Sequence, residues 1–200
     1  MISIYKIKPK FQQILKPILD WLYKKNVTAN QLTLAAILLS AFMGISLWFS
    51  NLWHLGFLII PIGLLIRMAL NALDGMMART YNMQSKLGEV LNELGDVVSD
   101  MFIYIPLMQI YGVFPEVVIA FVSLSIVNEF AGFMGKVVSQ ERRYDGPMGK
   151  SDRALVIGVL CLTLYFTPLD AMIVNGILIT SCVLMVISSF IRLSKALKNG

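Results

Sequence analysis

The sequence predicts an all-α integral membrane protein, with six transmembrane helices and an N-terminal amphipathic helix at the membrane interface. Hydrophobic residues make up 57% of the 200-residue chain and charged residues only 14%, whereas soluble domains average about 25% charged residues. Six apolar stretches approach the roughly 20 residues that a helix needs to cross the hydrocarbon core. All Lys and Arg residues can be placed on one side of that topology, as the positive-inside rule requires.

Residues 1–26 form the predicted amphipathic segment, and residues 27–200 form a single six-span domain. Lysines interrupt the segment throughout, so it does not resemble a cleavable signal peptide. Its apolar residues recur at helical spacing: Ile7, Phe11, Ile14, Leu15, Ile18, Leu19 and Leu22. Pro9 and Pro17 are expected to limit a continuous helix. We expect this segment to be a membrane-surface anchor in the cytoplasmic interface.

The six predicted spans cover residues 31–50, 54–77, 91–111, 115–138, 153–168 and 170–191. Thr28 is the expected N-terminal cap of the first span. The second helix is expected to continue into the polar residues 71–79, because only Gly75 weakens it there. Residues 80–86 form a short polar loop, and Pro106 is expected to kink the third span. Pro168 and Asp170 leave almost no loop between the last two spans.

The basic residues also predict the orientation of the chain. The loops near residues 51–54, 112–116 and 167–170 contain no Lys or Arg, and all 17 basic residues belong to the other side. Both termini and the polar tract at residues 71–96 are therefore expected on the cytoplasmic side of a bacterial inner membrane. The net charge of +5 indicates membrane lipids with anionic headgroups as partners, and it does not indicate nucleic acid.

The cysteines and the histidine give no sign of a metal or catalytic site. Cys161 and Cys182 fall within predicted spans without CxxC spacing, so both are expected to be free thiols. The single histidine, His54, lies on the side of the membrane opposite the polar tract. This placement argues against a histidine metal ligand and against histidine acid–base catalysis.

The polar tract contains the side chains that are suited to binding a metal ion or a phosphate group. Asn71, Asp74, Gly75 and Ala78 share one face of the second helix, and Gly88, Asn92, Asp96 and Asp100 share one face of the third. Two antiparallel helices joined by a short loop pack as neighbours, so these two faces are expected to meet. Oxygen ligands without His or Cys favour a hard cation such as Mg²⁺ or Mn²⁺. Arg79, on the same helix as Asp74, is suited to bridging phosphate oxygens.

The tract resembles the motif of the CDP-alcohol phosphotransferase family. The sequence reads Asp74-Gly75-x-x-Ala78-Arg79, eight residues, then Gly88-x-x-x-Asn92-x-x-x-Asp96. The family pattern is D-x-x-D-G-x-x-A-R, eight residues, then G-x-x-x-D-x-x-x-D, with the same spacing at every step. The residues VTANQLT ahead of the first span resemble the family's T-P-N-x-x-T stretch. The predicted six-span topology agrees as well, so the resemblance covers nearly the whole chain.

The resemblance implies a phospholipid-synthesising enzyme. Such enzymes transfer a phosphatidyl or similar phosphoalcohol group from a CDP-linked donor, such as CDP-diacylglycerol, to an alcohol acceptor and release CMP. Their four acidic positions hold two divalent cations, and the last acid is the proposed base for the acceptor hydroxyl. Family members are commonly homodimers, so a homodimer is also implied.

Each role that the resemblance implies can be assigned to a residue of this chain. The implied ligands of Mg²⁺ or Mn²⁺ are Asn71, Asp74, Asn92 and Asp96. Asp96 is also the implied catalytic base. Asn30, Thr33 and Asn71 would lie near the cytidine, Gly75, Ala78 and Gly88 would make room for the nucleotide, and Arg79 would contact the diphosphate.

The chain departs from the family pattern at two of its four aspartates. Asn71 and Asn92 replace them, and an amide oxygen ligates a hard cation without bringing charge. Cation binding should therefore be weaker, or a second ion lost. Asp100, Glu89 and Glu93 lie on adjacent turns, and Asp100 is expected to pair with a neighbour or to orient another ligand. Ala29 also replaces the family's usual proline.

Several alternatives remain open at the level of sequence. Glu129, within the fourth span, either contacts the acceptor alcohol or pairs with a basic residue such as Arg67. Arg67 itself is expected to snorkel to the interface. Lys150 and Arg153 either bind a phosphate-bearing substrate or belong to an ordinary positive loop. The alternatives to an enzyme are a degenerate relative that binds nucleotide or lipid without turnover, and a small transporter or channel. Clustering of acids at two helix ends disfavours the transporter.

Overall fold

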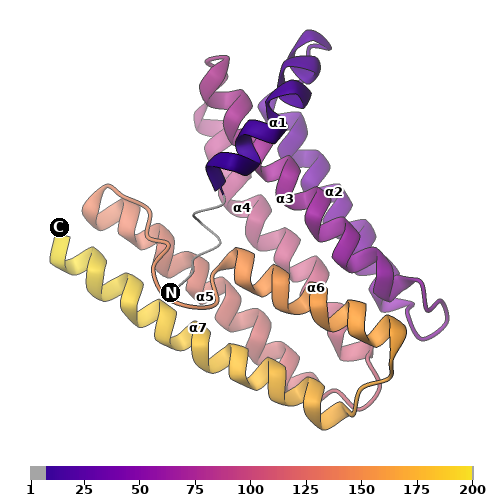
Figure 1. The fold of residues 1–200 in the computed structure, drawn as a ribbon. Helices are drawn as coiled ribbons and strands as arrows, with labels where there is room; N and C mark the ends of the chain where they lie inside the picture. The colour runs from indigo at the N-terminus through magenta and orange to yellow at the C-terminus, as the bar shows by residue number, and fades with distance from the viewer. Residues whose placement is uncertain (1–7, 200) are drawn as a thin grey trace.

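The computed structural model describes residues 8–199, with side chains placed for residues 11–198. Within these residues every regular element is helical (Figure 1): α1 Lys8–Lys24, α2 Ala29–Trp48, α3 Gly56–Thr80, α4 Lys86–Tyr104, the 3₁₀ helix η2 Ile105–Gln109, α5 Pro115–Ser139, α6 Lys150–Phe166 and α7 Ala171–Asn199. The all-α prediction is confirmed. Ile7, which was predicted on the apolar face of the first helix, lies outside the described residues.

Each predicted span has a helix, and four of the described helices are long and apolar enough to cross a membrane. These are Ala29–Trp48, Gly56–Thr80, Pro115–Ser139 and Ala171–Lys198. The helices of the other two predicted spans, α4 and α6, do not meet both conditions, each for a different reason. Glu89, Glu93, Asp96 and Asp100 make α4 too charged, and α6 has only 17 residues. Composition and length thus support four spans, and α4 and α6 fill the remaining two predicted positions.

The first helix is continuous, contrary to the expectation from its prolines. Pro17 lies inside α1, and Pro9 falls in the first turn, where the backbone N–H has no helical partner in any case. Leu15 and Leu19 are buried against the ends of α2 and α3, and this packing offsets the hydrogen bond that Pro17 removes. Ile14, Ile18 and Trp21 remain exposed, as expected for a helix in the membrane interface.

The remaining helices pack by close approach of their backbones. In Figure 1, α2 lies against α3 and α4, α6 lies against α3, and α5 runs beside α7. At Gly44 of α2, an added Cβ would lie 2.1 Å from the backbone oxygen of Phe102 in α4. The two helices can therefore approach this closely only because residue 44 has no side chain.

We expect Gly44→Ala to lower the midpoint of thermal unfolding, because the obstacle is backbone and cannot rotate away. Overpacking of this kind costs about 1–3 kcal/mol. Gly176→Ala is the matched control, since no atom lies within 4 Å of a Cβ at that helical position. The measurement is thermal unfolding of both variants in detergent. Equal midpoints would show that α2 and α4 are not in contact at residue 44.

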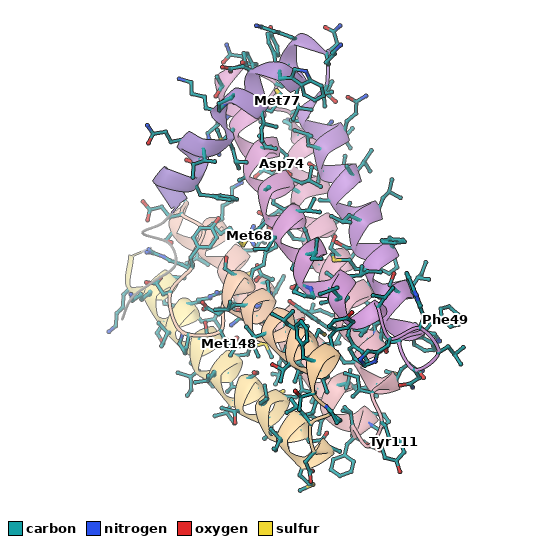
Figure 2. The ribbon with its side chains drawn as sticks, turned by 45° about the vertical axis from the view of Figure 1, so that its right-hand side comes forward. Phe49, Met68, Asp74, Met77, Tyr111 and Met148 are labelled. Atoms are coloured by element: carbon teal, nitrogen blue, oxygen red, sulfur yellow. The ribbon has the colours of Figure 1, made fainter. Side chains whose placement is uncertain are left out.

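Local sequence fixes the ends of the helices that carry the polar tract. Thr28 caps α2 with a capping box to Gln31, as predicted. Ser85 caps α4 by accepting a hydrogen bond from the Gly88 N–H at 3.0 Å. The third predicted span breaks at Pro106, where α4 gives way to η2. Figure 2 shows Asp74 toward one end of the bundle and Tyr111 at the other.

Candidate active site

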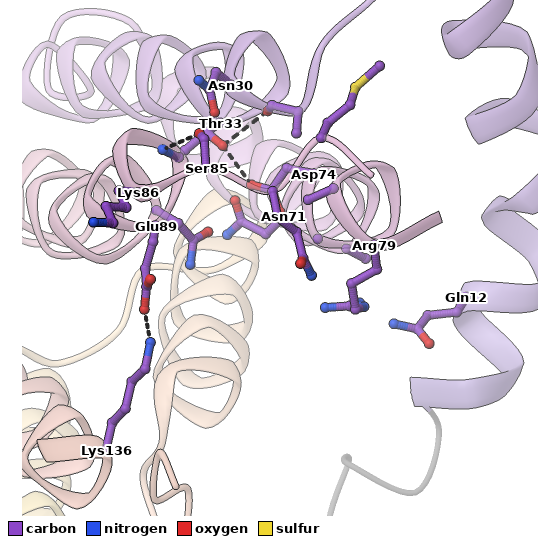
Figure 3. Close-up of a pocket in the computed structure, with 18 of the residues that line it drawn as sticks. Gln12, Asn30, Thr33, Asn71, Asp74, Arg79, Ser85, Lys86, Glu89 and Lys136 are labelled. Atoms are coloured by element: carbon purple, nitrogen blue, oxygen red, sulfur yellow. Dashed lines mark hydrogen bonds and ion pairs between the residues drawn. The ribbon is translucent and has the colours of Figure 1, made fainter. Parts of the chain in front are cut away.

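The polar tract borders a cavity of about 730 Å³ formed mainly by α2, α3 and α4. Nine of the predicted site residues line it: Asn30, Thr33, Asn71, Asp74, Gly75, Ala78, Arg79, Gly88 and Asn92. Figure 3 shows Thr33, Asn71 and Asp74 close together in this cavity. The motif residues of α3 and α4 therefore border one cavity. The expectation that these two helices pack directly against each other is wrong, because both pack against α2, which holds them on either side of the cavity.

Asp74 is held in a defined position by the neighbouring helix. The Thr33 hydroxyl donates to Asp74 Oδ2 at 3.0 Å (Figure 3). The same hydroxyl lies 3.2 Å from the Ala29 carbonyl oxygen of its own helix. Only 5% of Asp74 is exposed. Thr33 and the backbone of Gly75 orient this carboxylate, which lines the cavity.

Glycines in the tract allow backbone and polar groups to approach one another. A Cβ at Gly88 would lie 2.7 Å from Asn30 Oδ1, which is too close for a carbon atom. At Gly75 the nearest atom would be a guanidinium nitrogen of Arg79, 3.3 Å away. These two positions keep the cavity open beside Asn30 and Arg79, where a nucleotide and its phosphates were expected.

Asp96 lies beside the cavity, where α3, α4 and α6 meet. Asn71, which lines the cavity, places its Nδ2 3.5 Å from Asp96 Oδ1. Lys150 Nζ forms an ion pair with that same oxygen, and Arg67 donates to the Asp96 carbonyl at 3.2 Å. Asn71 therefore lies on the wall of the cavity that Asp74 also lines, and its amide reaches toward Asp96 behind that wall.

A network of buried ion pairs lies behind Asp96. Asp100 contacts Arg67 and Arg153, each at 2.8 Å. Glu129 contacts Arg153 and Arg142, also at 2.8 Å, and Arg142 also pairs with Glu93. Three cations and three anions thus balance among α3, α4, α5, α6 and the loop that follows α5.

This network decides several alternatives that the sequence left open. The expected pairing of Asp100 with a neighbour is confirmed. The suggested pairing of Glu129 with Arg67 is wrong, and so is the expectation that Arg67 snorkels, because Arg67 is 3% exposed and binds Asp100. Glu129 and Arg153 do not line the cavity; each contacts charged side chains within the bundle.

Some residues of the cavity wall were not predicted from the sequence. The polar ones are Gln12, Gln84, Ser85, Lys86, Lys136 and Tyr144. Glu89, which the sequence placed one turn from the motif, lines the wall as well. Glu89 and Lys136 form an ion pair across the rim (Figure 3). Gln12 lies on the polar face of α1, and only the packing of α1 against α3 brings it near the motif. Its signal in the sequence was weak, because Gln12 is one of two adjacent glutamines in a surface helix.

The donor atoms of the cluster suit a hard divalent cation. Asn71, Asp74 and Asn92 offer carboxylate and amide oxygens to one cavity, with Asp96 adjacent. Nowhere in residues 8–199 do three or more His, Cys, Asp or Glu side chains gather to hold a metal ion. The negative charge of the donor set therefore comes from two carboxylates only. Cys161 and Cys182 are free thiols, and His54 contacts Tyr165 at the far end of α6.

Comparison with known proteins identifies the family. Residues 26–191 match the family model of the CDP-alcohol phosphatidyltransferases. The chain belongs to this family. The resemblance seen in the motif is thereby confirmed, and the family places the chain among membrane transferases of phospholipid synthesis.

Two relatives and one solved structure extend this result. The chain is 46% identical over 166 residues to the inner membrane protein YnbA of Escherichia coli, covering 83% of this chain and 82% of YnbA. It is 30% identical over 101 residues to the archaetidylinositol phosphate synthase of Aeropyrum pernix, covering 50% and 52% of the two chains. The fold resembles that of the phosphatidylinositol phosphate synthase PgsA1 of Mycobacterium tuberculosis, solved with CDP-DAG bound. The TM-score is 0.76 at 17% identity, covering 92% and 94% of the two chains, so this likeness concerns the fold alone.

Proposed function

We propose that this protein transfers a phosphatidyl (phosphoalcohol) group from a CDP-linked lipid, such as CDP-diacylglycerol, to an alcohol acceptor and releases CMP. The observation that carries the proposal is the convergence of the motif on one cavity, with Asp96 beside it. Membership of the family supports the same reaction. The resemblance of the fold to PgsA1 with CDP-DAG bound agrees with a lipid-linked nucleotide as donor.

In the proposed reaction the acceptor oxygen forms a bond to the phosphorus that carries the lipid. The bond from that phosphorus to the bridging diphosphate oxygen breaks, and CMP leaves with the electron pair. Asp96 accepts the proton of the acceptor hydroxyl. Arg79 offsets the charge on the diphosphate with its planar fork of donors. Positioning and charge stabilisation account for most catalysis at phosphorus.

The remaining motif residues bind and orient the donor. Asn30, Thr33 and Asn71 lie on the cavity wall near the proposed cytidine position, and Gly75, Ala78 and Gly88 leave room for the nucleotide. Mg²⁺ or Mn²⁺ bound by Asn71, Asp74, Asn92 and Asp96 would supply charge stabilisation at the phosphate oxygens. Lys150 and Arg153 act near Asp96: Lys150 through its ion pair, and Arg153 through Asp100 and Glu129.

The proposal includes location and assembly. The relative YnbA is an inner membrane protein, and we place this chain in the same membrane, with both termini and the cavity on the cytoplasmic side. The cavity lies at the end of the bundle where α1 packs, which suits a lipid substrate entering at the headgroup level. A homodimer, implied by the family resemblance, completes the proposal and is testable by mass determination in detergent.

The test is release of CMP by the purified protein. CDP-diacylglycerol, Mg²⁺ or Mn²⁺ and a panel of alcohols should yield CMP and a new phospholipid with at least one acceptor. The panel should include glycerol phosphate, inositol phosphate, serine and a lipid alcohol. Asn71 and Asn92, which replace acids, favour a second candidate, a relative that binds without turnover. Retained CDP binding with no CMP from any acceptor would support that candidate and reject the enzyme.

The contact between Thr33 and Asp74 gives a further prediction for this reaction. Thr33→Val keeps the shape of the side chain and removes the hydroxyl that donates to Asp74. We expect CMP release to fall about tenfold, because a hydrogen bond to a carboxylate is worth about 1.5 kcal/mol or more. Ser40→Ala is the control, since the one hydrogen bond of the Ser40 hydroxyl among residues 11–198 goes to the Ala36 carbonyl of its own helix. An equal loss in both variants would mean that Thr33 acts through the stability of α2.

A further inference from the structure

Lys150 occupies an unusual position for a residue of a cytoplasmic loop. It is the first residue of α6, and its Nζ pairs with Asp96 Oδ1, the oxygen nearest Asn71 Nδ2. Arg153 lies one turn after Lys150 on α6, and Asp100 lies one turn after Asp96 on α4. Arg153 and Asp100 form a second ion pair between the two helices. The second contact is fully buried, so it fixes the position of α6 relative to α4 and holds Lys150 over Asp96.

The charges of the cluster limit how many divalent cations it holds. Asn71 and Asn92 bring no charge, so the four predicted metal ligands carry only the two negative charges of Asp74 and Asp96. The Lys150 ammonium already balances Asp96. A second divalent cation at Asp96 would lie beside this ammonium with no further carboxylate to offset it, and like charges a few ångströms apart repel each other even at high effective dielectric.

One divalent cation gives a better balance with the proposed donor. Asp74, Asp96, Lys150, Arg79 and one divalent cation together carry two positive charges, the number needed to neutralise a diphosphate diester. With two divalent cations the same set would carry four positive charges. At the rim Glu89 and Lys136 neutralise each other, and Lys86 adds one further positive charge. An ammonium has three N–H donors, and its contact with Asp96 leaves donors for phosphate oxygens.

We propose that the Lys150 ammonium takes the place of a second divalent cation at Asp96, so that the site holds one divalent cation, on the Asp74 side. The role in transfer rests on the proposed function, whereas the number of bound ions does not. Lys150 is then a built-in cation that stays in place between turnovers. Its charge supports the diphosphate without any dependence on metal concentration.

The test counts Mn²⁺ bound to the purified protein, by electron paramagnetic resonance of the free ion during titration. Wild type should bind one Mn²⁺ per chain. Asn71→Asp with Asn92→Asp should still bind one tightly. Adding Lys150→Met to that pair should create a second Mn²⁺ site that is at least about tenfold tighter than any second site of the double variant that keeps Lys150. A tenfold difference in affinity corresponds to about 1.4 kcal/mol, and a unit charge a few ångströms from a divalent cation repels it by more than that. Lys150→Arg in the same background should keep the count at one.

Lys195→Met in that background is the matched control, because Lys195 also pairs with an aspartate, Asp145, away from the cavity. It should leave the count unchanged. Wild type binding two Mn²⁺ or none, or a second site indifferent to Lys150, would overturn the inference. Counting ions needs no turnover. Absence of CMP release with the expected counts would therefore reject the proposed function and leave the assignment of Lys150 standing.

Discussion

Asp96→Asn is expected to abolish CMP release while donor binding stays within about twofold of wild type. The amide keeps the shape of the side chain and its contact with Asn71, but it cannot accept the proton of the acceptor hydroxyl. A positioned base contributes about 10²–10⁴-fold to such a step, so the residual rate should lie near the detection limit. CMP release and binding of a CDP-linked lipid, measured on the same preparation, separate the two effects.

The control for this variant is Asp170→Asn, which makes the same change in the loop between α6 and α7. Asp170 accepts from the Met172 N–H at 2.7 Å, and an amide oxygen can do the same, so activity should be unchanged. The Asp96 variant frees Lys150, whose side chain is 27% exposed, so only a small change in thermal stability is expected. Turnover above about a tenth of wild type would remove Asp96 from the role of base.

The sequence predicted much of this site because its signals are local. Helical spacing placed Asn71, Asp74, Gly75 and Ala78 on one face of α3, and a short loop kept the start of α4 near the end of α3. Direct packing of α3 against α4 was also expected, but both helices pack against α2 instead. The cap at Thr28 and the break at Pro106 also depend on adjacent residues. Nine predicted residues line one cavity for that reason.

Pairings between distant residues could not be predicted in the same way. Lys150 is 54 residues from Asp96, and helical periodicity says nothing about which cation meets which acid. Glu129 was matched with Arg67 because both lie in apolar spans. The structure instead pairs Glu129 with Arg142 and Arg153. The packing of α4, α5 and α6 determines which cation pairs with which acid. The pairing of Lys150 with Asp96, on which the expected number of metal ions depends, is set in the same way.

Asp100→Asn should cause the largest loss of stability among the substitutions considered. Arg153 keeps Glu129 as a partner at 2.8 Å. Arg67 loses the one ion pair that it forms within the described part of the chain and retains a hydrogen bond to the Asp96 carbonyl. Arg67 is 3% exposed, so its charge would stay buried without compensation. Removal of one partner from a buried pair costs about 3–5 kcal/mol, which should appear as a marked fall in the midpoint of thermal unfolding in detergent.

A compensating variant separates charge balance from shape. Asp100→Asn combined with Arg67→Met removes both members of the pair, and the network returns to equal numbers of cations and anions. We expect the double variant to recover most of the lost stability, because the cost of the single change comes from the uncompensated Arg67.

Glu141→Gln is the surface control: Glu141 is 75% exposed and 3.8 Å from Arg143, a pairing worth at most about 1 kcal/mol. If Asp100→Asn were as mild as Glu141→Gln, water would have to reach Arg67. The anchoring of α6, and with it the placement of Lys150 over Asp96, would then need another cause.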